Sequence, residues 1–268
     1  MFEFKNIFRG LAMGITDLVP GVSGSTVLMV LGVYERFIAS LHGLTTKDWK
    51  QSLRFLIPLG VGVGSALLIF SRIISWLLEN HQPLTMFLFL GLILGIVPIL
   101  VKEVDIKRTF KPTHYIFLFT AFVLIALTSL LPHEDTLMTD LSIWNYFFLF
   151  IAGWLASAAL ILPGISGSLI FLLLGVYTTI TNAISTLQIP VILAVGAGIA
   201  IGLLLTSKLV RYLFKAYMTH TYAVMIGLVA GSIIVLFSQI DSGGSILGCG
   251  ITFVAGLLIA YLLGSTQK

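Results

Sequence analysis

Charged residues and cysteine are both scarce in this 268-residue chain. Only 10% of the residues are charged, whereas a soluble domain has about 25%, and 58% are hydrophobic. A soluble fold needs a polar shell that this composition cannot supply, so a soluble globular enzyme is excluded. Cys249 is the sole cysteine, which excludes an intrachain disulfide scaffold. The composition therefore predicts an all-α protein that crosses a membrane several times.

Motifs for catalysis, metal binding and nucleotide binding are also missing. The five histidines are scattered without the spacing of metal ligands, and there is no phosphate-binding loop of the ATPase type. No Ser/His/Asp or Cys/His pattern suggests covalent catalysis. We therefore expect no metal, no cofactor and no enzymatic activity. The net charge of +4 does not indicate nucleic-acid binding, because the positions of the charges in a membrane protein record its orientation.

Long apolar segments are what the chain has in abundance. Six of them approach the length of about 20 residues that a helix needs to cross the bilayer: Phe55–Leu78, Leu84–Val101, Thr113–Leu131, Ile189–Ser207, Tyr222–Ser238 and Ile246–Gly264. Two more apolar stretches are interrupted: Gly10–Leu44 at Pro20-Gly21 and Trp144–Leu187 at Pro163-Gly164. Proline removes a backbone donor and glycine tolerates unusual dihedrals, so we expect a helix to stop at each break.

The two interrupted stretches resemble each other. The first contains LVPGVSGSTVLMVLGVY and the second LILPGISGSLIFLLLGVY, at an offset of 143 residues. Farther along, Gly91 and Gly95 correspond to Gly227 and Gly231 at an offset of 136. The chain is therefore predicted to be one transmembrane domain over 1–268, built from two repeats at about 5–132 and 144–266.

Lysine and arginine give the expected orientation, because they stay on the cytoplasmic side of short loops. If each interrupted stretch is a re-entrant hairpin, every basic residue except Arg72 falls on the cytoplasmic side, as do both termini. Each repeat then has one hairpin and three spans. Three is odd, so the second repeat is inverted relative to the first, which is the architecture of alternating-access secondary transporters.

The hairpin tips are the strongest candidates for a binding site. A second half-helix is expected to begin after each Pro-Gly, with free N–H groups and a positive dipole end that suit an anion. The residues that would bind it are Ser23, Gly24, Ser25 and Thr26 in the first tip and Ser166, Gly167 and Ser168 in the second. The alternative is that the serines only cap their half-helices.

Charged residues within apolar segments are costly and are usually functional. Asp17 lies three residues before Pro20, and we expect it to couple transport to H⁺ or Na⁺; the alternative is an ion pair with a lysine or arginine. Glu35 is the second coupling candidate, with an exposed ion pair at the membrane edge as the alternative. Arg72 and Lys208 correspond to each other in the repeats and are expected to bind an anionic headgroup, unless they only extend to the interface.

The stretch RGLAMGITDLVPGVSGSTVLMVLGVYE resembles the N-terminal motif of the bacterial polyprenyl-phosphate transporter family. The segment LPGISGSLIFLLLGVY is similar to the second motif of that family. In both, serine (Ser25, Ser168) stands where the family usually has glycine after the Ser-Gly pair. The resemblance places Asp17, Pro20, Gly21 and Ser23 through Thr26 in the first motif, and Pro163, Gly164, Ser166, Gly167 and Ser168 in the second.

The resemblance also implies a function. The protein would be a flippase in the bacterial cytoplasmic membrane that returns undecaprenyl phosphate, or a related polyprenyl phosphate, to the cytoplasmic leaflet for cell-wall synthesis. The phosphate would pass between the two tips while the tail stays in the bilayer. Two alternatives stay open, a secondary transporter or channel for a small anion and an intramembrane lipid-phosphate enzyme. A homo-oligomer is compatible with all of them.

Overall fold

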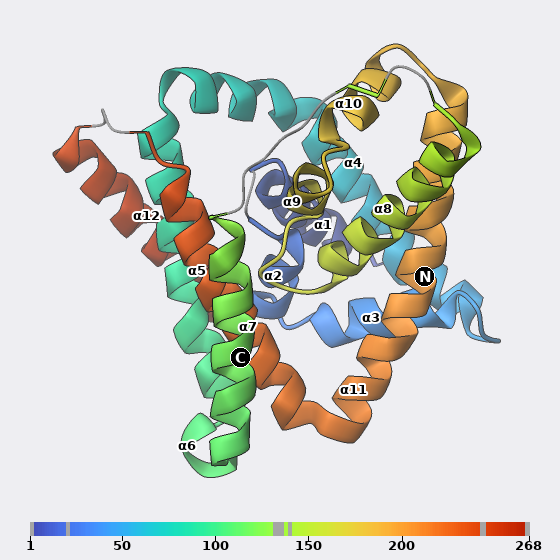
Figure 1. The fold of residues 1–268 in the computed structure, drawn as a ribbon. Coiled ribbons are helices and arrows are strands. Elements are labelled where there is room, and N and C mark those ends of the chain that lie inside the picture. The colour runs from blue at the N-terminus through green and yellow to red at the C-terminus, as the bar shows by residue number, and fades with distance from the viewer. Residues whose placement is uncertain (1–2, 20–21, 131–136, 139–140, 242–244, 266–268) are drawn as a thin grey trace.

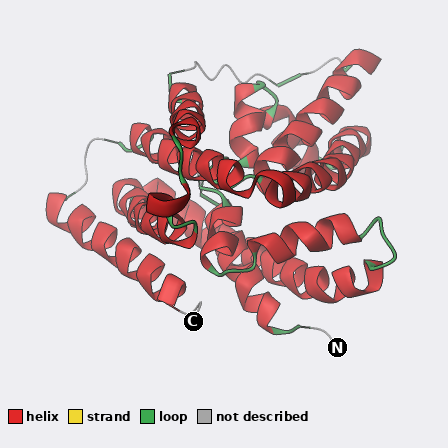
Figure 2. Cartoon of the chain, turned by 90° about the horizontal axis from the view of Figure 1, so that it is seen from below, coloured by secondary structure: helices red, strands yellow, loops and turns green. Residues whose placement is uncertain are grey.

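The computed structural model describes residues 3–19, 22–130, 137–138, 141–241 and 245–265. Within these ranges the chain is helical and has no strand (Figures 1 and 2). The helices are α1 (Lys5–Asp17), α2 (Gly24–Val30), α3 (Tyr34–Gly43), α4 (Trp49–Asn80), α5 (Gln82–Glu103), α6 (Ile106–Thr109), α7 (Pro112–Thr128), α8 (Ile143–Ile161), α9 (Gly167–Leu173), α10 (Tyr177–Ser185), α11 (Ile189–Ser238) and α12 (Ile246–Ser265).

The helices are long and apolar enough for a multi-pass membrane protein. Five of them pass on length and hydropathy, namely α4, α5, α8, α11 and α12, and α7 is a shorter apolar helix of 17 residues. All six predicted spans are helical. The helices that precede the two Pro-Gly breaks end where predicted, α1 at Asp17 and α8 at Ile161.

One boundary differs from the prediction. The segments Ile189–Ser207 and Tyr222–Ser238 are joined in the single 50-residue α11, which is broken only at Tyr217 (φ −140°, ψ 47°). Between Gly202 and Gly227 the sequence has no proline or glycine. Nothing local therefore stops the helix between the two apolar segments.

Each motif has the same sharp bend behind it. The short helices α2 and α9 are both seven residues long, and they meet α3 and α10 at 116° and 118°. Gly32 (φ 65°) and Gly175 (φ 66°) lie at the two bends, in the left-handed region that favours glycine. Figure 1 shows α10 at the top of the molecule and α3 in its lower half.

Glycine allows close helix packing at matching places in both repeats. A Cβ on Gly10 would lie 2.0 Å from the Leu59 carbonyl oxygen, where α1 crosses α4. A Cβ on Gly153 would lie 2.4 Å from the Val195 carbonyl oxygen, where α8 crosses α11. The offsets of 143 and 136 residues connect these two pairs, so one packing arrangement occurs twice in the chain.

The remaining spans pack across the two repeats. Gly91 of α5 lies against Phe253 of α12, and Gly227 of α11 lies against Leu118 of α7. The glycines correspond at the offset of 136 residues. Each repeat therefore supplies its last span to the other repeat.

These contacts predict a sharp difference between neighbouring glycines of α4. A Cβ on Gly62 would lie 2.1 Å from the Ile7 carbonyl oxygen, whereas a Cβ on Gly60 would have no neighbour within 4 Å. We expect Gly62→Ala to destabilise the protein by about 1–3 kcal/mol through overpacking. Gly60→Ala should leave stability unchanged or raise it by up to about 1 kcal/mol, because alanine favours helix. Thermal unfolding in detergent measures both, and equal melting temperatures for the two variants would contradict the packing described.

Candidate functional site

The two repeated motifs meet through hydrogen bonds that connect distant parts of the chain. The backbone N–H of Gly164 donates to Oγ1 of Thr26 over 3.1 Å, and both groups are buried. The hydroxyl of Tyr34 donates to the carbonyl oxygen of Ile161 over 2.9 Å. The first motif therefore holds the turn of the second in place.

The two motifs differ in how deeply they are packed. All seven residues of α2 are buried, whereas Leu169 is the one buried residue of α9. Tyr34 is 3% exposed, and its counterpart Tyr177 is 37% exposed. Leu169 also replaces Thr26 at the repeat offset. The second motif is therefore the more open of the two in this conformation.

The motif serines do not cap their helices. Ser23 and Ser166 occupy the N-cap positions of α2 and α9, but neither side chain makes a capping hydrogen bond. The hydroxyls bond in pairs instead, Ser23 with Ser25 at 2.8 Å and Ser166 with Ser168 at 2.7 Å. The capping alternative is thus wrong for these serines, and each motif presents a pair of hydroxyl groups.

Asp17 replaces serine as the cap of α2. Its Oδ1 accepts a hydrogen bond from the backbone N–H of Gly24 over 2.7 Å. A Cβ on Gly24 would lie 2.6 Å from Oδ2 of Asp17, so glycine makes room for the carboxylate. Among the described residues, Asp17 forms no ion pair with a lysine or arginine. The ion-pair alternative is therefore not what the structure contains.

A cavity of about 180 Å³ brings the two motifs to one place. Asp17 of the first motif lines it together with Ser166, Gly167 and Ser168 of the second. Ser157 of α8 adds a third hydroxyl group to the lining, and the rest of the wall is apolar. We call this the motif cavity. It combines one carboxylate with several hydroxyl groups in an apolar surrounding, which can bind a polar headgroup and a cation or proton.

The other predicted residues lie in different places. Pro20 and Gly21 are outside the described residues. Pro163 is buried, and Gly164 (φ 87°) lies so close to Leu228 that a Cβ would be 2.5 Å from its carbonyl carbon. Arg72 and Lys208 are exposed and do not line the motif cavity; Lys208 lies near His42 of α3.

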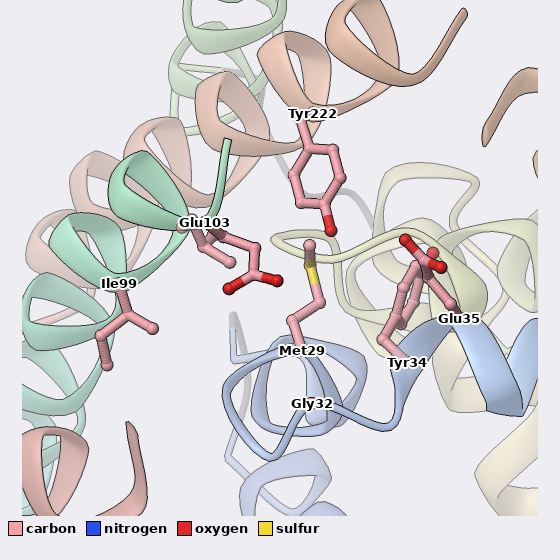
Figure 3. A pocket seen from close by; sticks show the side chains of 8 residues that line it. Met29, Gly32, Tyr34, Glu35, Ile99, Glu103 and Tyr222 are labelled. Atoms are coloured by element: carbon pink, nitrogen blue, oxygen red, sulfur yellow. The ribbon is translucent and has the colours of Figure 1, made fainter. Parts of the chain in front are cut away.

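Glu35 lies in a second cavity, of about 190 Å³, behind the bend of the first motif (Figure 3). Glu103 of α5 faces it across this space, and Tyr222 of α11 points into the gap and hydrogen-bonds to Glu35. Arg36 pairs with Glu3 rather than with its neighbour Glu35. The cavity therefore carries two carboxylates that belong to different helices.

Sequence reasoning did not find Ser157, Glu103 and Tyr222. At the repeat offsets their counterparts are Gly14, Gln239 and Met86, so none of the three is repeated. The comparison of the repeats therefore gave no signal for them. A polar residue on an otherwise apolar helix was the one available sign for Ser157.

No group of three or more His, Cys, Asp or Glu side chains that could hold a metal occurs among the described residues. The apolar helices and the shared motif cavity define a multi-pass α-helical membrane protein whose polar site lies where its two repeated motifs meet. Comparison with known proteins gives the family. A family model described as undecaprenyl phosphate translocase-like matches residues 13–243, so the chain belongs to that family.

Two curated relatives agree with this assignment. A polyprenyl-phosphate transporter of Staphylococcus aureus is 38% identical over 98% of this chain and 96% of its own length. A polyprenyl-phosphate transporter of Vibrio cholerae is 33% identical over 87% of this chain and 77% of its own length. No solved structure matches the chain. The resemblance derived from the motifs is thereby confirmed.

Proposed function

We propose that this protein moves undecaprenyl phosphate, or a closely related polyprenyl phosphate, from the outer to the cytoplasmic leaflet of the bacterial cytoplasmic membrane. The lipid carrier would then be available again for cell-wall synthesis. The observation that carries the proposal is the motif cavity, where Asp17 meets Ser166 and Ser168 in a chain whose curated relatives are polyprenyl-phosphate transporters.

The phosphate binds at the motif cavity and the isoprenoid tail stays in the lipid. Hydroxyl groups can donate to phosphate oxygens, and the hydroxyls of Ser166 and Ser168 are paired with each other and can be redirected to a ligand. The apolar wall excludes water, which strengthens hydrogen bonds to a charged group. Asp17 in the same cavity repels a phosphate anion, so binding is linked to a proton or a Na⁺ ion that neutralises the carboxylate.

Transport proceeds by alternating access between two inverted halves, each a re-entrant hairpin with three spans. The paired bends of 116° and 118° and the repeated glycine contacts support this arrangement. Both termini lie in the cytoplasm, as the basic residues indicate. The packed first motif and the open second motif fit one of the two access states.

Purified protein in liposomes tests the proposal. A fluorescent short-chain polyprenyl phosphate should change leaflets faster with protein than without it, and an imposed pH or Na⁺ gradient should change the rate. No free phosphate should be released, which separates transport from lipid-phosphate hydrolysis. Inorganic phosphate trapped inside the liposomes should stay there, which separates a lipid substrate from a small anion. Equal rates with and without protein would contradict the proposal.

A further inference from the structure

A third polar cavity lies away from both cavities described above. Its volume is about 180 Å³, and it is formed by one face of α3, the start of α4 and the middle of α11. The side chains that give it its character are Arg36, Ser40, Asp48, Ser52 and Arg211. We call it the arginine cavity.

Two buried serines in this cavity have no hydrogen-bond partner. Ser40 is 8% exposed and Ser52 is 5% exposed. Among the described residues, neither hydroxyl group forms a hydrogen bond, although both line the cavity. A buried polar group without a partner is costly, about 1–3 kcal/mol. Such hydroxyl groups are expected to bond to a ligand or to water.

The two guanidinium groups give the arginine cavity its charge. Arg36 is held by an ion pair with Glu3, and its Cζ lies 5.1 Å from the centre of the Phe55 ring. Arg211 forms no ion pair with any described residue. Guanidinium groups match the geometry of phosphate oxygens better than any other side chain does.

The first turn of α4 adds to this preference for an anion. Gln51 and Ser52 lie in that turn and both line the cavity. The N-terminus of a 32-residue helix carries a partial positive charge. Asp48 at the N-cap is the one carboxylate among the lining residues, and it disfavours a ligand with a second phosphate group.

We infer that the arginine cavity binds the singly esterified phosphate of a polyprenyl lipid, as a site separate from the motif cavity. The assignment of this face to the cytoplasmic side rests on the proposed function. There the arginine cavity receives the headgroup after it has crossed the membrane. Its hydroxyl groups and guanidinium groups replace the hydrogen bonds that the phosphate loses when it leaves the motif cavity.

A cysteine placed in the arginine cavity gives a local readout that does not depend on transport. Ala39 lines the cavity and can be replaced in a cysteine-free background, Ala39→Cys with Cys249→Ser. The rate of labelling by a charged maleimide is measured in purified protein. Farnesyl phosphate should slow the labelling at least fivefold, whereas farnesol, which has the same tail without phosphate, should not.

Variants and related probes test the chemistry of the site. Arg211→Gln should abolish the protection and Ser40→Ala should weaken it, whereas Lys215→Gln should preserve it, since Lys215 is one turn farther along α11 and does not line the cavity. Equal protection by farnesol, by farnesyl diphosphate or by inorganic phosphate at the same concentration would overturn the assignment to a lipid monophosphate. Equal protection in the Arg211 and Lys215 variants would overturn the site.

A last variant separates this inference from the proposed function. The double variant Ser166→Ala/Ser168→Ala changes the motif cavity and should leave the protection of Cys at position 39 intact. Loss of the protection in that variant would overturn a separate site. Protection in a protein that moves no lipid in liposomes would contradict the proposed transport and leave the arginine cavity established as a phosphate site.

Discussion

Asp17→Asn should separate lipid binding from ion coupling. The asparagine side chain keeps an oxygen that can accept the hydrogen bond from Gly24, so the cap of α2 and the fold are retained. The variant loses the negative charge in the motif cavity and the group that can take up a proton or a Na⁺ ion. We therefore expect polyprenyl phosphate to bind several-fold more tightly and transport to lose its response to an imposed gradient.

The measurement is lipid movement in liposomes with and without a pH or Na⁺ gradient. A binding assay in detergent runs in parallel. Asp105→Asn is the matched control, because Asp105 is exposed, pairs with Arg108 and lines none of the three cavities. A variant at Asp17 that still responds to the gradient as the unmodified protein does would exclude this residue as the coupling group.

Removal of the second hydroxyl pair should have the largest effect on binding. Ser166→Ala/Ser168→Ala takes away two donors to the phosphate, and a hydrogen bond to a charged group contributes about 1.5–3 kcal/mol. Loss of the pair should therefore weaken binding and lower transport at least tenfold. The fold should survive, because these hydroxyl groups bond to each other and cap no helix.

Ser232→Ala is the control for that experiment. Ser232 is as deeply buried as the motif serines, but its hydroxyl donates to the carbonyl oxygen of Val229 within α11. This variant should bind and transport the lipid normally. If the two motif serines can be removed with transport unchanged, the phosphate binds elsewhere.

Repeated features were accessible from the sequence, because each occurs twice. The breaks after Asp17 and Ile161 were predicted from Pro-Gly, and the comparison of the two motifs drew attention to the serines. The glycines that allow close packing were also visible as corresponding pairs. Local chemistry explains all of these features, since proline, glycine and apolar length act on the helix in which they occur.

Features that arise where separate helices meet could not be predicted in this way. Glu103 faces Glu35 because the ends of α5 and α3 come together, and no spacing in the sequence encodes that distance. The placement of Lys208 failed for the same reason: its correspondence with Arg72 was sound as sequence, but exposure on α11 keeps it out of the motif cavity. The continuous α11 shows the complementary error, in which two apolar segments were separated although no residue between them ends a helix.

The exchange of the last spans between repeats has a consequence for biogenesis. The first repeat leaves the ribosome with the glycine face of α5 uncovered and with α7 lacking its main partner. These surfaces are completed when α11 and finally α12, at the C-terminal end of the chain, enter the membrane. Half of this protein is therefore no folding unit, and during synthesis its N-terminal helices must wait in the bilayer for a segment synthesised more than a hundred residues later.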